Sequence, residues 1–132
     1  MNTPTPDASR RGFEFRQLVS LVLQLADVPA QARPPRPRTL HERLEQPQEP
    51  SDVLGVPDWL LRTHTASARD LALGVDEAQA AAAEAKVPYF AAIWKRPRKA
   101  AHDAYVIMPL QQFANIIHEL EKNSEKNSEQ DL

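Results

Sequence analysis

Apolar residues recur three and four positions apart in three stretches of the chain, a spacing typical of helices with one buried face. The first stretch covers residues 11–27 and ends before Pro29, which stops a helix. The second covers residues 70–86, and the third begins at Pro109, a residue suited to a first helical turn, and ends near residue 121. The side chains expected on the buried faces are Phe15, Leu18, Val19, Val22, Leu25 and Ala26 in the first helix, Leu71, Val75, Ala78, Ala82 and Ala85 in the second, and Leu110, Phe113, Ala114, Ile117 and Leu120 in the third.

Three shorter apolar runs have the length of β-strands. Residues 89–95 form a nearly continuous apolar and aromatic run, as expected for a central strand that is covered on both faces. Residues 104–108 follow a charged connection and are expected to pair antiparallel with that strand as a hairpin. The third run, residues 59–62, follows a polar turn that contains glycine and proline. The order of these elements predicts an α/β fold in which a small mixed sheet is flanked by three helices.

The remaining segments are not expected to form regular structure. Residues 1–10 are polar and contain prolines, which predicts a disordered leader. Residues 28–50 are rich in proline, and because proline stops helices and removes strand donors we expect an irregular segment. Residues 122–132 contain a direct KNSE repeat and few apolar groups, which predicts a disordered tail. A single folded domain is therefore expected over residues 11–121.

The composition narrows the class of protein. The chain has 132 residues, 42% of them hydrophobic, which is enough for one domain and leaves no room for a second. It contains no apolar run near the ~18 residues that a membrane-spanning helix needs, and its first residues are polar, so we expect a cytoplasmic protein with no membrane partner. Cysteine is absent, which excludes disulfides and thiolate metal ligands and leaves only histidines and carboxylates as ligands.

The charge is nearly balanced overall but uneven along the chain. A formal net charge of −2 argues against a uniformly basic nucleic-acid binder, so DNA contact must depend on local basic clusters. Two such clusters are present, and both are expected to contact phosphates. One is Arg33, Arg36 and Arg38 in the Pro-rich segment, and the other is Lys95, Arg96, Arg98 and Lys99 after the expected central strand.

Candidate chemistry gathers in the stretch from Asp52 to His64. An aspartate precedes a turn and a buried strand, and the strand ends in Arg62, Thr63 and His64. This is the layout of a metal-dependent nuclease site in which an aspartate, an acidic residue and a lysine cooperate, but here a cation stands at the acidic position and a histidine at the lysine position. At about 4 Å and an effective dielectric near 20, unit charges interact by roughly 4 kcal/mol, and a divalent ion would be repelled about twice as strongly.

Several stretches carry a resemblance to one family. An N-terminal helix begins with an aromatic residue and Glu14, and Asp52 is followed ten residues later by Arg62. The stretches DLALGVDEAQAAAAEAKVPYFAAIWKR and DAYVIMPLQQFANII then look like a helix and strand, and a last strand and helix, of that family. From Gly12 to Glu121 the chain resembles the small Holliday-junction-resolvase-like nucleases of actinobacteria and their phages, in the PD-(D/E)XK superfamily.

The resemblance implies a restriction-endonuclease-like fold and a site at Asp52, His64 and Glu14, with Arg62 beside them. Asp52 would be the metal ligand, and Mg²⁺ would be the cofactor of an active enzyme. Because Arg62 and His64 replace the acidic residue and the lysine, we expect impaired catalysis and no bound cofactor. Phosphate would instead contact the cationic side chains, Arg62 together with Arg33, Arg36, Arg38, Lys95, Arg96, Arg98 and Lys99.

The function expected from the sequence is therefore binding of branched or duplex DNA by a catalytically impaired relative of these resolvases, such as a phage accessory protein of replication or recombination. One alternative is an active metal-dependent endonuclease with a rearranged site. Another is a protein-interaction module that uses the fold as a scaffold. A homodimer is compatible with each of these functions.

Overall fold

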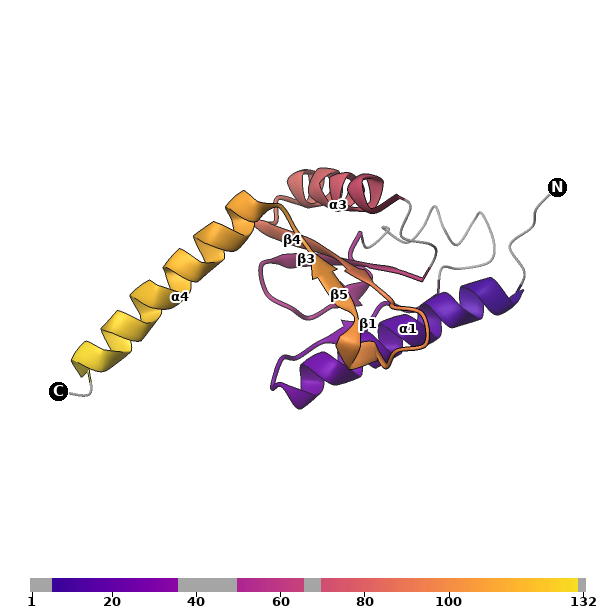
Figure 1. The fold of residues 1–132 in the computed structure, drawn as a ribbon, viewed down its shortest axis with the longest axis horizontal. Helices are drawn as coiled ribbons and strands as arrows, with labels where there is room; N and C mark the ends of the chain where they lie inside the picture. Colours follow the sequence, from indigo (N-terminus) through magenta and orange to yellow (C-terminus); the bar gives the residue numbers. More distant parts are fainter. Residues whose placement is uncertain (1–5, 36–49, 66–69, 131–132) are drawn as a thin grey trace.

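A five-stranded sheet lies between two helices, and a third helix leads away from it (Figure 1). The computed structural model describes residues 6–35, 50–65 and 70–130. In chain order the elements are α1 (Pro6–Leu25), β1 (Gln31–Ala32), β2 (Val53–Leu54), β3 (Trp59–His64), α3 (Leu71–Ala85), β4 (Tyr89–Trp94), the short 3-10 helix η2 (Ala101–Asp103), β5 (Tyr105–Ile107) and α4 (Leu110–Gln130). The expected α/β class with a mixed sheet and three helices is confirmed.

The strands lie in the sheet in the same order as in the chain. Strands β3 and β4 are parallel, with Trp59 opposite Tyr89 and His64 opposite Trp94, and α3 makes the crossover between them. All other neighbouring strands are antiparallel. The predicted hairpin of β4 and β5 is therefore confirmed, and β4 is an interior strand as its apolar sequence indicated.

Each face of the sheet has its own hydrophobic cluster. On one face, Phe15 and Val19 of α1 pack against side chains of the sheet that include Leu61 and Ile93. On the other face, alanines of α3 contact Leu60 and Phe90. Small residues let α3 approach the sheet closely, as its alanine-rich stripe predicted.

The buried face of α1 is narrower than the sequence predicted. Phe15 and Val19 are buried, but Leu18 and Leu25 are exposed. The sheet covers only the stripe that contains Phe15 and Val19, and Leu18 and Leu25 lie to one side of that stripe, where they face solvent. The helix also begins at Pro6, inside the segment that was expected to be a disordered leader.

Helix α4 differs most from the prediction. Its expected buried stripe is exposed at Leu110, Phe113, Ile117 and Leu120, and the helix projects away from the sheet (Figure 1). It also continues to Gln130, where a disordered tail was expected from residue 122. Periodicity shows that a helix has an apolar face but not which body that face will meet.

The Pro-rich segment is only partly described. Residues 31–32, for which no regular element was expected, form strand β1 and pair with β2. Arg36 and Arg38 lie outside the described residues. Among the helices of the described part of the chain, none combines the length and the hydropathy needed to cross a membrane.

Candidate functional site

The topology brings several charged segments to one edge of the sheet. Strands β1, β3 and β4 all end at this edge, while the antiparallel strand β2 begins there. Arg33 therefore follows β1, Asp52 precedes β2, His64 ends β3 and Lys95 follows β4. We call this side of the molecule the carboxyl edge, and such edges are where open α/β sheets commonly bind ligands.

Asp52 is buried at the carboxyl edge and completes the pairing of two strands. Only 7% of the residue is exposed. Its Oδ2 accepts a hydrogen bond from the Thr63 backbone N–H at 2.8 Å and lies 3.3 Å from the Thr63 hydroxyl, and its own N–H donates to the Leu61 carbonyl at 2.7 Å. The carboxylate thus takes the place of a backbone acceptor just before the short strand β2 begins.

Three arginines surround this carboxylate. Arg33 Nη2 donates to Asp52 Oδ1 at 2.8 Å, Arg16 Nη1 lies 3.8 Å from the same oxygen, and Arg62 Nε lies 3.9 Å from Oδ2. We call these four residues the Asp52 cluster. Three guanidinium groups and one carboxylate give a formal charge of +2, because three positive charges less one negative charge remain.

Different elements hold the three guanidinium groups in place. Arg62 also donates from Nη1 to the Pro50 carbonyl at 3.1 Å, which ties the side chain to the segment before β2. Arg16 comes from α1 and lies over the ring of Phe13, 5.3 Å from its centroid. Arg33 is fixed through its backbone, whose N–H donates to the Asp52 carbonyl at 2.9 Å. The Asp52 cluster therefore joins α1 to three strands of the sheet.

This arrangement is unsuited to a divalent metal at Asp52. Mg²⁺ needs accessible oxygen ligands, but both carboxylate oxygens of Asp52 face hydrogen-bond donors or guanidinium groups. Glu14, the other carboxylate that the sequence suggested, is exposed on α1 and pairs with Arg10 at 3.1 Å. Within the described residues, no three histidine or carboxylate side chains gather in a way that could hold a metal ion.

His64 lies against an aromatic side chain at the end of β3. Its ring stacks on Trp94, with 4.1 Å between the ring centroids. Burial, and then the positive charge of Arg62, lower the pKa of His64 from the ordinary value of 6.5, although Asp52 and Glu77 oppose this change. The imidazole is therefore neutral near pH 7. Its Nε2 is buried and has no hydrogen-bond partner among the described residues.

The second basic cluster follows β4 at the same edge. The Lys95 N–H donates to the His64 carbonyl at 2.9 Å, which ties the start of this loop to the end of β3. Arg96 lies over the ring of Tyr105, 4.6 Å from its centroid. Arg98 and Lys99 are exposed at the tip of the loop. The structure thus brings Lys95, at the start of this cluster, and Arg33 and Arg62 to the same edge of the sheet.

Arg16 is the member of the Asp52 cluster that the sequence did not reveal. It lies beside the predicted buried stripe of the first helix, where an arginine is normally read as solvated. Only the packing of α1 over the end of β1 directs it toward Asp52. In the structure, the buried Ser20 hydroxyl donates to the Arg16 carbonyl at 2.9 Å, one turn along the same side of the helix, but nothing in the sequence alone indicates this contact.

Comparisons of this chain with protein-family models, with curated proteins and with solved structures give no match.

Proposed function

We propose that this protein binds nucleic-acid phosphates along the carboxyl edge and does not cleave them by a metal-dependent route. The observation that carries the proposal is the Asp52 cluster, in which three guanidinium groups meet one carboxylate. A site built to hold Mg²⁺ has an excess of negative charge, whereas this site has an excess of positive charge. Such an excess attracts phosphate, and the proposal retains the expected kinship with resolvase-like nucleases as that of a degenerate relative.

The width of the basic surface favours a polymer over a single small anion. Arg33 follows β1, Arg62 lies two residues before the end of β3, and Lys95 follows β4. From β1 to β4 the sheet spans three strand spacings. With strands about 4.8 Å apart, the basic groups cover roughly 14 Å before the exposed loop residues are counted. Phosphates on one DNA strand advance about 3.4 Å each along the helix axis, so several of them can be contacted at once.

Arg62 is the residue best placed to reach a phosphate from within the Asp52 cluster. Its side chain is 28% exposed, compared with 13% for Arg16 and 12% for Arg33. Arg16 and Arg33 then act mainly by holding Asp52 and keeping the local potential positive. The neutral imidazole of His64 adds no charge near pH 7.

The test is binding of duplex and four-way-junction DNA, followed by fluorescence anisotropy at several salt concentrations. We expect Arg62→Gln to weaken binding and to reduce the slope of log affinity against log salt by about one, because one phosphate contact is lost. Lys122→Gln is the matched control, since it removes one positive charge from an exposed position on α4. Equal affinities for the wild type and both variants would refute the proposal.

Cleavage is tested separately on plasmid and junction DNA with Mg²⁺ and with Mn²⁺. The proposal expects no nicking beyond the background of an Asp52→Ala preparation. Nicking that is present in the wild type and lost in Asp52→Ala would instead establish the alternative, a metal-dependent endonuclease with a rearranged site.

A further inference from the structure

Two polar contacts fix the orientation of α4. The side-chain amide of Gln112 is buried and bonds the backbone of Phe90 twice, accepting from its N–H at 3.2 Å and donating to its carbonyl at 2.7 Å. Two turns further along, Glu119 accepts a hydrogen bond from the Tyr89 hydroxyl at 2.7 Å. Gln112 and Glu119 lie on the same side of the helix, and this side therefore faces β4.

The apolar stripe of α4 points elsewhere. Leu110, Phe113, Ile117 and Leu120 are 79%, 49%, 41% and 62% exposed. At about 100° of rotation per residue, the centre of this stripe lies roughly 130° around the helix from the side that Gln112 and Glu119 occupy. The two polar contacts thus hold the stripe away from the protein's own sheet.

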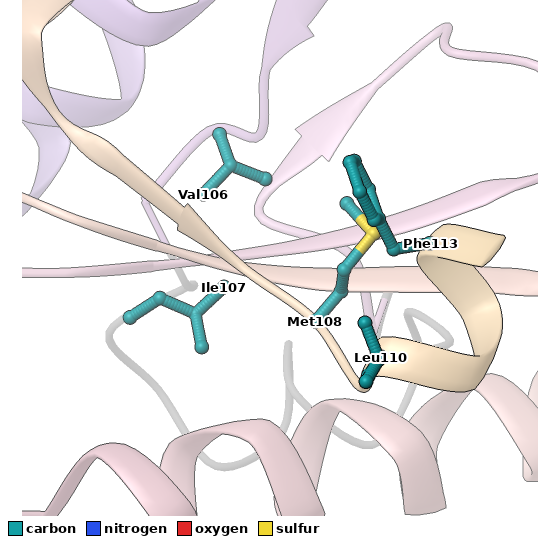
Figure 2. Close-up of a pocket in the computed structure, with 5 residues that line it drawn as sticks. All are labelled: Val106, Ile107, Met108, Leu110 and Phe113. Carbon is teal, nitrogen blue, oxygen red and sulfur yellow. The ribbon is translucent and has the colours of Figure 1, made fainter. Parts of the chain in front are cut away.

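The stripe continues into a hollow beside β5. An open hollow of about 470 Å³ is lined by Val106, Ile107, Met108, Leu110 and Phe113 (Figure 2). Leu110 and Phe113 belong to both the stripe and the hollow, so the two form one apolar surface at the end of the sheet. A contiguous exposed apolar surface of this kind marks an interaction site.

The spacing and charges of α4 identify the occupant. The stripe residues follow one another at intervals of three, four and three, the spacing with which two helices interlock. Residues 110–117 carry no charge. In the next turns Glu121 and Glu125 lie nearer the stripe, whereas Lys122 and Lys126 lie on the opposite side of the helix. In an antiparallel pair, these carboxylates lie beside the positive N-terminal end of the other helix, which has no acidic residue in its first turn.

We propose that this surface binds a second copy of the same chain, with the two α4 helices antiparallel about a two-fold axis near Ile117. Phe113 of each copy then packs against Leu120 of the other, and the Ile117 side chains of both copies meet at the axis. The same surface serves both copies, as a two-fold contact requires. A parallel pair would instead place Glu121 and Glu125 of one helix beside the same carboxylates of the other, which costs energy.

Single cysteines test this arrangement directly, because the chain has none of its own. In the proposed pair, residue 117 lies next to its symmetry mate, whereas the two copies of residue 110 are about 20 Å apart along the helix axis. A disulfide needs α-carbons within about 7 Å. Ile117→Cys should therefore give an oxidised covalent dimer of the full chain, and Leu110→Cys should not.

Sedimentation equilibrium measures the oligomeric state of the full chain without any introduced cysteine. We expect a wild-type dimer at micromolar concentration, and a dissociation constant at least about tenfold weaker for Ile117→Glu and for Leu120→Glu. Asn115→Asp, an exposed change outside the stripe, is the control and should dimerise like the wild type. Circular dichroism of each variant verifies that the fold is retained.

Three results would overturn the proposal. A wild-type monomer at all accessible concentrations would show that the stripe does not bind a second copy. Cross-linking through both Leu110→Cys and Ile117→Cys would indicate a parallel pair. A dimer that neither cysteine cross-links would place the interface on another surface.

Discussion

Arg33 Nη2 lies 2.8 Å from Asp52 Oδ1, although the two residues are nineteen positions apart in the chain. The contact joins the segment after β1 to the segment before β2, and it places a cation beside the buried carboxylate. This ion pair thus links two segments of the fold, and its arginine adds positive charge at the carboxyl edge. This double role makes the effect of removing Asp52 informative.

Replacing Asp52 with alanine is expected to destabilise the protein by on the order of 3 kcal/mol. The change leaves three guanidinium groups close together and removes the acceptor of the Thr63 N–H. Removing one partner of a largely buried ion pair commonly costs about 3–5 kcal/mol. Denaturant unfolding measures the loss as a change in the free energy of unfolding.

Asp103→Ala provides the matched control for Asp52→Ala. Asp103 also lies near a basic side chain, His102 at 3.7 Å, but both side chains are well exposed. Such an exposed pair is expected to change the free energy of unfolding by less than about 1 kcal/mol. Similar losses in the two variants would mean that the Asp52 cluster contributes no more than a surface pair.

His64 should make stability depend on pH near neutrality. Burial and Arg62 lower its pKa in the folded state, while the unfolded chain keeps a value near 6.5. As the pH falls through 6.5, the unfolded state takes up the proton first, so the free energy of unfolding decreases until the pH passes below the lowered folded pKa. Stability from this residue is therefore present above the unfolded pKa and lost as the medium becomes acidic.

His64→Phe should remove this part of the pH dependence and keep the stacking on Trp94. The measurement is the free energy of unfolding of wild type and variant between mildly acidic and neutral pH, with the difference assigned to residue 64. The slope of the free energy of unfolding against pH should differ between wild type and variant by no more than the uptake of about one proton on unfolding accounts for. An NMR titration in which His64 of the folded protein titrates above 6.5 would contradict the argument.

Gln112 should be worth more to stability than its neighbour Gln111. Gln112→Leu leaves the buried N–H and carbonyl of Phe90 without their side-chain partners, which costs about 1–3 kcal/mol. Gln111 is exposed and bonds to Asn115 on its own helix, so Gln111→Leu should change stability by about 0.5 kcal/mol or less. Thermal and denaturant unfolding compare the two variants, and equal effects would show that Gln112 does not anchor α4.

Local patterns predicted most of the elements but not their partners. The apolar run from Tyr89 onward identified an interior strand because such a run is stable only when both faces are covered. The stripe of Leu110, Phe113, Ile117 and Leu120 identified a helix, yet the prediction that it closes the core was wrong. The three hydrogen bonds that orient α4 involve polar side chains whose partners are about twenty to thirty residues away, and periodicity carries no information about them.

The candidate site was predicted only in part for a related reason. Asp52, Arg62 and His64 lie within one turn and strand, so their proximity follows from the local sequence. Arg33 and Arg16 join them through the pairing of β1 with β2 and the packing of α1, which are contacts between distant segments. A cluster of this kind becomes visible only when the sheet order is known.

Two glycines in helices make a matched pair with opposite expected outcomes. Alanine stabilises a helix more than glycine does, by up to about 1 kcal/mol. Helix propensity alone therefore predicts that both Gly12→Ala and Gly74→Ala stabilise the protein. At Gly12 a new β-carbon meets nothing within 4 Å, and the variant should show this gain. At Gly74 it would come within 2.7 Å of Trp94 Cζ3 and 3.2 Å of His64 Nε2.

The clash at Gly74 should outweigh the gain in propensity. Trp94 is buried in strand β4 and stacked on His64, so neither ring can move without disturbing the packing of α3 on the sheet. Overpacking of this kind typically costs about 1–3 kcal/mol, which exceeds the propensity term. Denaturant unfolding should therefore give a higher free energy of unfolding for Gly12→Ala than for the wild type, and a lower one for Gly74→Ala. Stabilisation in both variants would mean that α3 does not lie as close to Trp94 and His64 as the structure places it.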